Sequence, residues 1–440
     1  SKAIASRPVA NASQALQGVV PGLNLTVGNS GGSLDGEMNI NIRGTGTIGD
    51  GSSSSPLILI DGIEGNLNTV NPADIESVSV LKDAASASIY GARASFGVIL
   101  VTTKSGKSGK TNVSYSGNAR FNNAIGLPDV MDSYKFAQYF NRASANRGGG
   151  QIFSDAVLDR IQKYQEGTFK DTTVDNGSGI WQKWSNANGN TDWMDEFFGG
   201  WAVSQEHNIS VNGGNEKTQF VMSGSFLDQN GLIKHGSDDF QRYTMNAKIT
   251  TAVTDWFKIT LNTKWTREDF ARPTYLTGNF FHNLARKWPV HPAYDPNGFP
   301  MDEGEVEQME NGGLQNSQKD FFTNQLHLVF EPIKNWRINL EGSVRTTTQY
   351  QHWEVLPVYA YDVEGNPYYT VWDMGYGSYA SGASRVNEYS WKENYYTTNI
   401  YSDYFKQFDN GHYFKVMAGF NAELYKTRSI TECNSNRYTF

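Results

Sequence analysis

Residues 74–106 read DIESVSVLKDAASASIYGARASFGVILVTTKSG, and this stretch decides the fold. Its second strand-like run centres on residues 98–101, VILV, which are continuously apolar and mostly β-branched. This pattern predicts a strand that is buried on both faces of a sheet. Residues 84–88, AASAS, have little bulk and can pack close to another backbone. Residues 104–106 end the run with polar residues typical of a turn.

Three motifs precede this stretch in a fixed order: ALQG with VPGL in residues 15–23, INIRG in residues 40–44 and LILIDG in residues 57–62. Together with LKDAASASIYGARASFGVILVTTKSG they resemble the plug-domain signature of SusC-like TonB-dependent outer-membrane transporters. Several linked motifs make this resemblance specific. It implies a small plug domain that sits inside a large membrane barrel.

Composition excludes several classes of protein. The 440 residues carry 37 basic and 45 acidic side chains, a net charge of −8, so no nucleic acid partner is expected. The single cysteine, Cys433, excludes a disulfide framework. The seven histidines show no paired ligand spacing, and we expect neither a metal nor a cofactor.

The chain beyond residue 111 alternates apolar and polar residues. In residues 256–266, for example, Phe257, Ile259 and Leu261 alternate with Lys258 and Thr260. A mean hydropathy of −0.53 therefore does not exclude a membrane protein, although no apolar run is long enough for a transmembrane helix. About nine such strands are predicted, at residues 112–121, 206–211, 218–226, 242–250, 256–266, 325–330, 336–345, 395–405 and 413–425.

Connection lengths also alternate. Links such as residues 251–255 and 331–335 are short, whereas residues 122–204 and 267–323 form long excursions. Outer-membrane barrels show this pattern, with turns at the periplasm and loops outside, and a soluble β-sandwich has no reason to keep it. The predicted fold is a transmembrane antiparallel β-barrel with a small α+β plug domain in the lumen.

We expect two domains. Residues 1–107 form the plug, with a helix at 11–16 capped by Asn11 and strands that include 23–27, 38–42, 57–60 and 77–81. Residues 108–440 form the N-terminal part of the barrel, because nine strands alone would leave two open edges in lipid. The resemblance implies a barrel of about 22 strands and a TonB box upstream of Ser1. The chain shows no signal peptide at Ser1, as expected of a mature or trimmed chain.

Two polar loops of the plug are candidate ligand sites. Their amide, hydroxyl and carboxylate groups suit sugar hydroxyls, which need both donors and acceptors, although ordinary turn residues look the same. The candidate substrate-binding residues are Asn29, Ser30, Asp35, Glu64, Asn66 and Asn68.

Arg43 ends a strand, and the resemblance implies that it locks the plug to carboxylates of the barrel wall. A desolvated arginine needs such a partner, and Glu341 and Glu423 lie on polar strand faces. Arg93 is a second candidate for the lock. The alternative is a surface arginine in each case.

Residues 44–49 match GxGxxG, but no helix follows, so we interpret them as a turn and not as a nucleotide site. The acidic run at residues 302–307 is expected to form a solvated face, with bridging of divalent ions to lipopolysaccharide as the alternative. Aromatic residues crowd the predicted outer loops and suit sugar stacking or a protein interface, or else an aromatic girdle at the membrane surface or packing within the loops. They are Trp181, Trp184, Trp193, Tyr359, Tyr361, Tyr368, Tyr369 and Trp372.

The resemblance implies TonB-dependent import through the outer membrane, together with a SusD-like surface lipoprotein and the TonB complex. Oligosaccharides are the expected cargo and oligopeptides the second class. A non-transporting glycan-binding surface protein stays open as an alternative. A glycan-degrading enzyme would need a carboxylate pair in a cleft, and no motif indicates catalysis.

Overall fold

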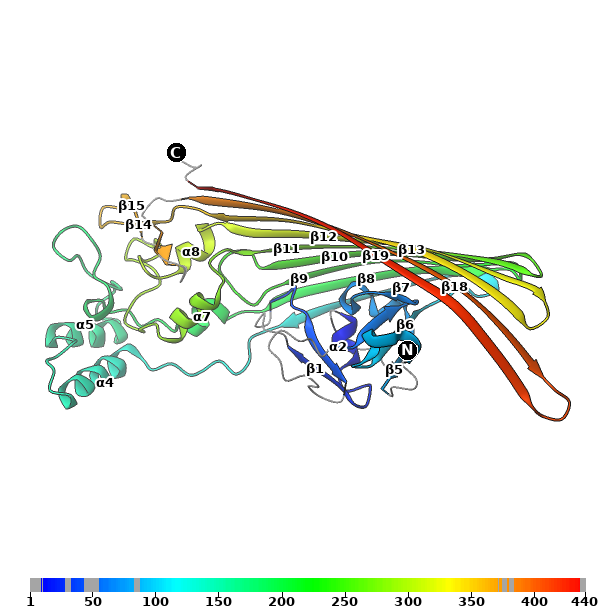
Figure 1. Ribbon diagram of the computed structural model, residues 1–440. Helices are drawn as coiled ribbons and strands as arrows, with labels where there is room; N and C mark the ends of the chain where they lie inside the picture. The colour runs from blue at the N-terminus through cyan, green and yellow to red at the C-terminus, as the bar shows by residue number, and fades with distance from the viewer. Residues whose placement is uncertain are drawn as a thin grey trace.

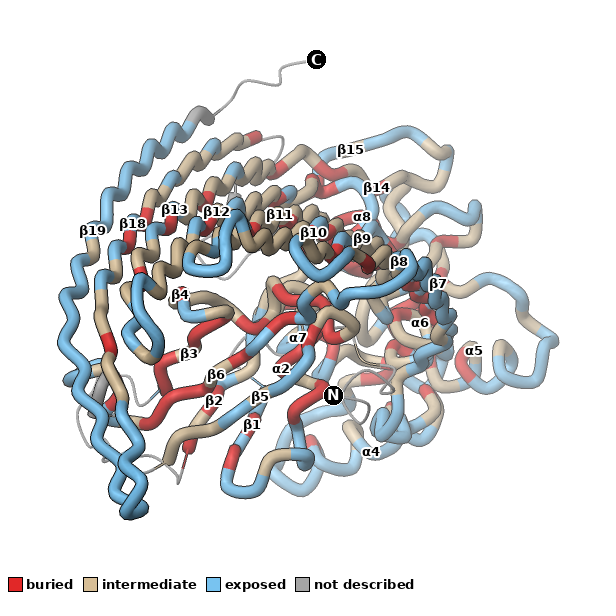
Figure 2. The backbone as a smooth tube through the Cα atoms, turned by 90° about the vertical axis from the view of Figure 1, so that its right-hand side faces the viewer, coloured by how far each residue is buried: buried red, intermediate tan, exposed pale blue. Residues whose placement is uncertain are grey.

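The computed structural model describes residues 9, 11–27, 33–42, 55–82, 88–370, 372–373, 378–379 and 384–435. A long curved sheet dominates the molecule, and a small N-terminal domain lies against its concave face (Figure 1). Figure 2, from a perpendicular direction, shows the strands arching over that domain. Within these residues, no helix has the length and apolar character needed to cross a bilayer.

The N-terminal domain combines one short helix with two small sheets. Helix α2 (Ala12–Leu16) is capped by the Asn11 side chain, which accepts a hydrogen bond from the Gln14 amide at 2.9 Å. Strands β1 (Leu23–Val27) and β2 (Met38–Ile42) form an antiparallel pair. The second sheet has the order β4-β3-β6-β5, with bounds Ile63–Glu64, Leu57–Ile60, Val98–Thr103 and Ile75–Leu81. Three 3-10 turns join these strands, η1 (Leu67–Thr69), η2 (Pro72–Asp74) and η3 (Ser88–Ala94).

Strand β6 is an inner strand of this sheet, as its apolar sequence predicts. Val98 and Ile99 are fully buried. Val98 packs into one hydrophobic cluster with Leu57, whereas Ile99 packs into another that contains Leu16. The predicted burial on both faces is therefore confirmed.

The large sheet contains nine strands in the order β19-β18-β13-β12-β11-β10-β9-β8-β7, with every neighbouring pair antiparallel. The first strands are β7 (Gly109–Asn122), β8 (Ala202–Gly214), β9 (Thr218–Asn230), β10 (Asp239–Thr254) and β11 (Phe257–Pro273). The others are β12 (Leu314–Ile333), β13 (Trp336–Val355), β18 (Arg385–Gln407) and β19 (Tyr413–Ser435). Each predicted strand is present, and each is longer than predicted.

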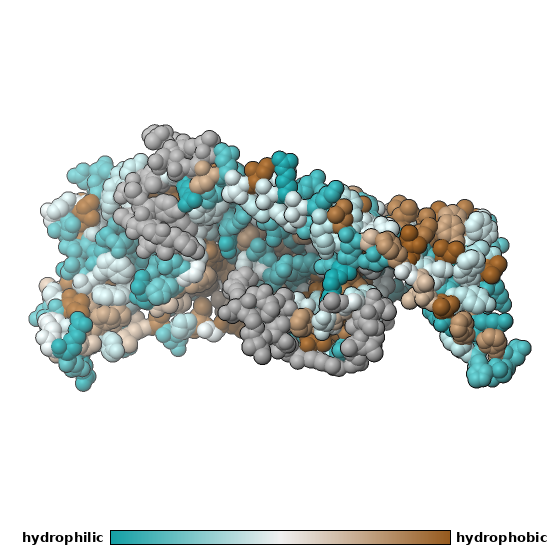
Figure 3. Space-filling model, viewed as in Figure 1, coloured by the Kyte–Doolittle hydropathy of each residue, from teal (hydrophilic) through white to brown (hydrophobic). Residues whose placement is uncertain are grey.

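The two faces of the large sheet differ in polarity. Buried polar residues such as Asn246, Asn262 and Gln325 lie on the face toward the N-terminal domain. The opposite face exposes apolar side chains in register, for example Leu261 opposite Leu326. Figure 3 shows these hydrophobic side chains concentrated toward the end of the strands where the short turns lie. An apolar outer face and a polar inner face are what the alternation of residues predicts for a membrane barrel.

The long connections contain helices that were not predicted. These are α4 (Ser133–Asn146), α5 (Asp155–Gln165), α6 (Trp193–Phe198), α7 (Gly278–Ala285) and α8 (Val306–Asn311), with the 3-10 turn η4 (Trp184–Asn186). Short strands add two small hairpins, β14 (Tyr359–Tyr361) with β15 (Pro367–Tyr369) and β16 (Trp372–Asp373) with β17 (Ser378–Tyr379).

The expectation of a solvated acidic face at residues 302–307 is wrong. Val306 and Met309 of α8 pack into a loop core with Phe280. This packing draws the neighbouring acidic residues inward, so that Glu305 pairs with Lys287 at 3.3 Å and both side chains are buried.

Candidate functional site

Asp61 connects the N-terminal domain to the large sheet. It follows β3, and its carboxylate, 7% exposed, accepts hydrogen bonds from the Thr103 amide at 2.8 Å and the Thr103 hydroxyl at 2.6 Å. From the large sheet, the Lys264 ammonium pairs with the same carboxylate, and Lys248 Nζ lies 3.9 Å away. Asn262 Nδ2 donates a further hydrogen bond at 3.1 Å. One buried anion therefore joins groups from both parts of the molecule.

The charge of Asp61 is fixed by these neighbours. Burial raises the pKa of the carboxyl, but the nearby Lys264 and Lys248 outweigh burial and lower the pKa from 3.8 to about 2. The residue therefore stays ionised at neutral pH.

Arg93 forms a second link between the domain and the sheet. Its guanidinium donates to both carboxylate oxygens of Glu423 on β19, at 2.6 and 2.7 Å, and to Glu64 of its own domain at 3.1 Å. Tyr425 also donates to Glu64 at 3.1 Å. The Arg93 side chain is 45% exposed, so this link is weaker than the buried one at Asp61.

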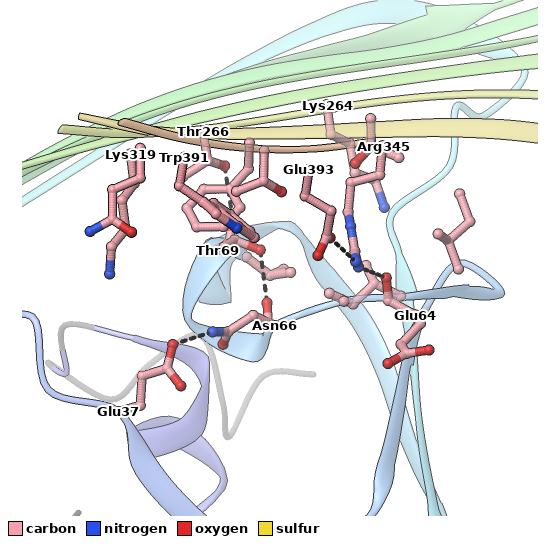
Figure 4. A pocket seen from close by; sticks show the side chains of 18 residues that line it. Glu37, Glu64, Asn66, Thr69, Lys264, Thr266, Lys319, Arg345, Trp391 and Glu393 are labelled. Atoms are coloured by element: carbon pink, nitrogen blue, oxygen red, sulfur yellow. Dashed lines mark hydrogen bonds and ion pairs between the residues drawn. The ribbon is translucent and has the colours of Figure 1, made fainter. Parts of the chain in front are cut away.

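A pocket of about 340 Å³ opens between these two links (Figure 4). From the N-terminal domain, Asn66 Nδ2 donates to Glu37 at 2.6 Å within the pocket lining. From the sheet, Arg345 donates to Glu393 at 2.9 Å and to the backbone oxygen of Glu64. The other lining residues include Thr69, Lys264, Thr266, Lys319, Gln349 and the indole of Trp391. The pocket thus offers donors, acceptors and an aromatic face.

Comparison with known proteins identifies the N-terminal domain. Residues 1–98 match the family described as TonB-dependent Receptor Plug Domain. The TonB-dependent receptor SusC of Bacteroides thetaiotaomicron is 33% identical over 58% of this chain and 22% of its own length. The TonB-dependent receptor P39 of Formosa agariphila is 32% identical over 66% of this chain and 24% of its own length.

The N-terminal domain is therefore a TonB-dependent receptor plug domain, and the chain as a whole is similar to SusC-like TonB-dependent receptors. It spans about a quarter of the length of these curated relatives. The family consists of receptors and transporters and not of enzymes.

A solved structure supports the fold. The RagAB peptide importer in its closed-closed state matches 99% of this chain and 48% of its own, with a TM-score of 0.78 and 22% identity. This likeness confirms the predicted fold, in which a plug lies against the wall of an antiparallel β-barrel. The receptor family and this barrel fold place the protein in the bacterial outer membrane.

The structure places only some of the predicted ligand residues in the pocket. Glu64 and Asn66 line the pocket. Asn68 does not line it, and its side-chain oxygen instead accepts a hydrogen bond from Ser13 of α2 at 2.8 Å. Asp35 accepts from Ser33 at 2.5 Å outside the pocket lining. Asn29 and Ser30 lie outside the described residues.

The two candidate lock residues have different outcomes. Arg43 and the GxGxxG turn at 44–49 lie outside the described residues. Arg93 contacts Glu423, one of the two wall carboxylates considered for Arg43. The other, Glu341, accepts a hydrogen bond from Gln325, which also donates to the Asp61 backbone oxygen at 3.0 Å.

Several lining residues were not predicted. Lys319, Trp391 and Glu393 come from strands far from the plug in sequence. The alternation of side chains along a strand could have indicated them, because Trp391 and Glu393 are two positions apart and therefore share one face of β18. Only the register of β18 against β13 brings them opposite the plug.

The loop aromatics differ in burial, from Trp193 in a packed loop core to Tyr369, which is 49% exposed. Trp193 is 2% exposed, and Trp184 stacks on His291 with ring centroids 4.7 Å apart. Burial lowers the pKa of His291 well below its ordinary value, and the Lys287 charge lowers it further. A second pocket of about 650 Å³ is lined by Trp184, Tyr369 and charged residues already paired with one another, such as Lys183 with Asp302 at 2.6 Å.

Proposed function

We propose that this chain is part of a transporter that imports a large hydrophilic nutrient across the outer membrane, using energy delivered through a TonB-type protein. The pocket between plug and wall carries the proposal. A ligand in this pocket touches both parts at once, so movement of the plug changes its contacts. Similarity to the TonB-dependent receptors and a polar inner wall both support this role.

An oligosaccharide is the proposed cargo. The indole of Trp391 can stack on the apolar face of a sugar ring, and the amide and carboxylate groups of Asn66, Glu37 and Glu64 can exchange hydrogen bonds with hydroxyls. An oligopeptide is the alternative cargo. It is favoured by the charged groups Lys319, Arg345 and Glu393, and a protein of the same fold is a peptide importer.

We propose two protein partners from the family, a SusD-like surface lipoprotein at the loop end and the TonB complex on the periplasmic side. We further propose that the plug is held to the wall at two links. Arg93 with Glu423 forms the exposed link, and Asp61 with Lys264 forms the buried one. Arg43 stays a candidate for a third.

The test combines uptake with binding. A deletion strain is complemented with the full-length gene and grown on a panel of oligosaccharides and peptides, and the purified protein is titrated with each growth-supporting compound by calorimetry. For Trp391→Ala we expect at least about a fivefold loss of affinity and slower growth, taking as a guide the roughly 1–3 kcal/mol that a nucleobase gains by stacking on an aromatic side chain. Trp256→Ala, an exposed indole outside the pocket, is the matched control.

The outcome separates the alternatives. Normal growth of the deletion strain on every compound would remove the transporter role. If the purified protein binds a compound that the deletion strain still takes up normally, a non-transporting glycan-binding surface protein would be favoured. Equal affinity of the Trp391 variant and the control variant would move the cargo site away from this pocket.

A further inference from the structure

Three cations lie together on the outward face of β18 and β19, outside the pocket and the plug contacts. They are Lys392, Lys426 and Arg428, and all three are exposed. We propose that this basic patch binds the phosphate headgroup of an anionic lipid in the outer leaflet of the membrane. The proposal rests on the membrane location and does not depend on what the protein imports.

The orientation of the patch follows from its neighbours. Trp391 and Glu393 line the inner pocket, so Lys392 between them points outward. Tyr425 reaches the plug residue Glu64, so the next residue, Lys426, also points outward. Arg428 stands directly opposite Lys392 in the ladder and shares its face.

Within the strands that the structure describes, the patch holds three positive charges and no carboxylate. Lys392 and Arg428 are directly cross-strand, and like charges in this arrangement destabilise a sheet. Lys426, opposite Asn394, occupies the next outward position along β19 and adds a third positive charge. Among the ion pairs of the described residues, none includes any of these three side chains. A bound anion would remove this repulsion.

The patch lies directly above the apolar belt. The outward pairs below it, Tyr396 with Leu424 and Ile400 with Phe420, are exposed and apolar. Lys392 lies about fifteen residues from the turn end of β18, about 50 Å along the strand and about 35 Å in height at a tilt of about 45°. An outer-membrane barrel has an apolar band of about 25 Å, so the patch reaches the headgroups of the outer leaflet.

The chemistry of the patch selects phosphate. An arginine fork matches phosphate oxygens in a bidentate manner, and two lysines add point charges within the same patch. Because the patch continues the lipid-facing stripe of the same two strands, its occupant is a lipid and not a soluble anion.

The test uses the full-length protein in nanodiscs of zwitterionic phospholipid doped with lipid A that carries its phosphates or has lost them. Retained lipid is counted by native mass spectrometry for the wild type, for Lys392→Gln/Lys426→Gln/Arg428→Gln and for a matched control. The control, Lys258→Gln/Lys334→Gln/Lys406→Gln, removes three exposed cations that are scattered near the turns. Migration of the unheated protein on gels reports folding.

We expect the wild type and the control to retain phosphorylated lipid A, with affinity that falls as salt rises. The patch variant should bind on the order of a hundredfold more weakly, since each cation near an anionic surface contributes about fivefold. If the triple variant fails to fold, the single variant Lys392→Gln should show about a fivefold loss.

Three results would overturn the proposal. The patch variant could retain phosphorylated lipid A as well as the wild type does. Dephosphorylated lipid A could be retained equally. Inorganic phosphate at millimolar concentration could displace the lipid completely, which would make the patch a site for free anions.

Discussion

At the scale of single residues, Asp61 and Arg93 make contrasting links between plug and wall. Asp61 is almost fully buried between two lysines, whereas Arg93 is half-exposed. Removing one member of a buried pair leaves an uncompensated charge, but an exposed pair contributes little because water screens it. The two links should therefore differ strongly in how much each holds the plug.

We predict that Asp61→Asn destabilises the docked plug by about 3–5 kcal/mol, because Lys264 loses its anion. Arg93→Gln, the matched control, should cost at most about 1 kcal/mol. Denaturant-dependent hydrogen exchange of peptides from β3 and β6 measures both. A larger loss for Arg93→Gln than for Asp61→Asn would contradict the assignment of the stronger link.

The pKa of Asp61 predicts a pH dependence with a definite sign. The folded pKa of about 2 lies below the ordinary 3.8, so the carboxylate stabilises the interface above pH 4 and this stabilisation is lost as pH falls from about 4 to about 2. Exchange protection of β6 should fall over this window in the wild type. Asp61→Asn should lack that component of the transition, and an identical pH profile in both proteins would refute the prediction.

At the scale of elements, the strands show what alternation can and cannot predict. Every strand of the large sheet was predicted, because apolar and polar positions alternate within the membrane. The strand ends were missed, because above the apolar belt the outward face turns polar. There Arg267 on β11 pairs with Asp320 on β12 at 2.9 Å, so a charged pair takes the place of apolar residues on the outward face. The loop helices were missed for a related reason: their apolar faces pack on one another, as Ala137 of α4 and Val157 of α5 do in one hydrophobic cluster.

Gly97, at the start of β6, is required by its conformation and by its surroundings. Its φ is +93°, and a Cβ there would meet Ile42 Cδ1 at 2.8 Å and the Leu81 oxygen at 3.0 Å. We predict that Gly97→Ala destabilises the plug by more than the strain of the left-handed conformation alone, about 1–2 kcal/mol.

Gly18→Ala, in the same domain, is the matched control for this prediction. Gly18 has a φ of +73° and open space around its Cβ position, so only the backbone strain applies. Chemical unfolding of the two variants compares them directly. Equal losses of stability would show that the contact with Ile42 and Leu81 does not matter.

At the scale of the whole molecule, the family and the fold followed from the linked motifs and the strand pattern, but the pocket did not. Glu64 and Asn66 could be proposed because they lie in a short polar loop of the plug. Trp391 and Glu393 could not be paired with them, because that requires the register of β18 and the docking of the plug against it. Asn68 was misplaced for the same reason, since only the packing of α2 turns it toward Ser13.

The most direct test of the central claim, that plug and wall build one cargo site, is hydrogen exchange of the full-length protein with and without a growth-supporting cargo. We predict that residues 63–70 of the plug and 389–395 of the wall gain protection together, while the short turn between β12 and β13 is unchanged. Protection confined to the outer loops, or to only one of the two segments, would contradict it.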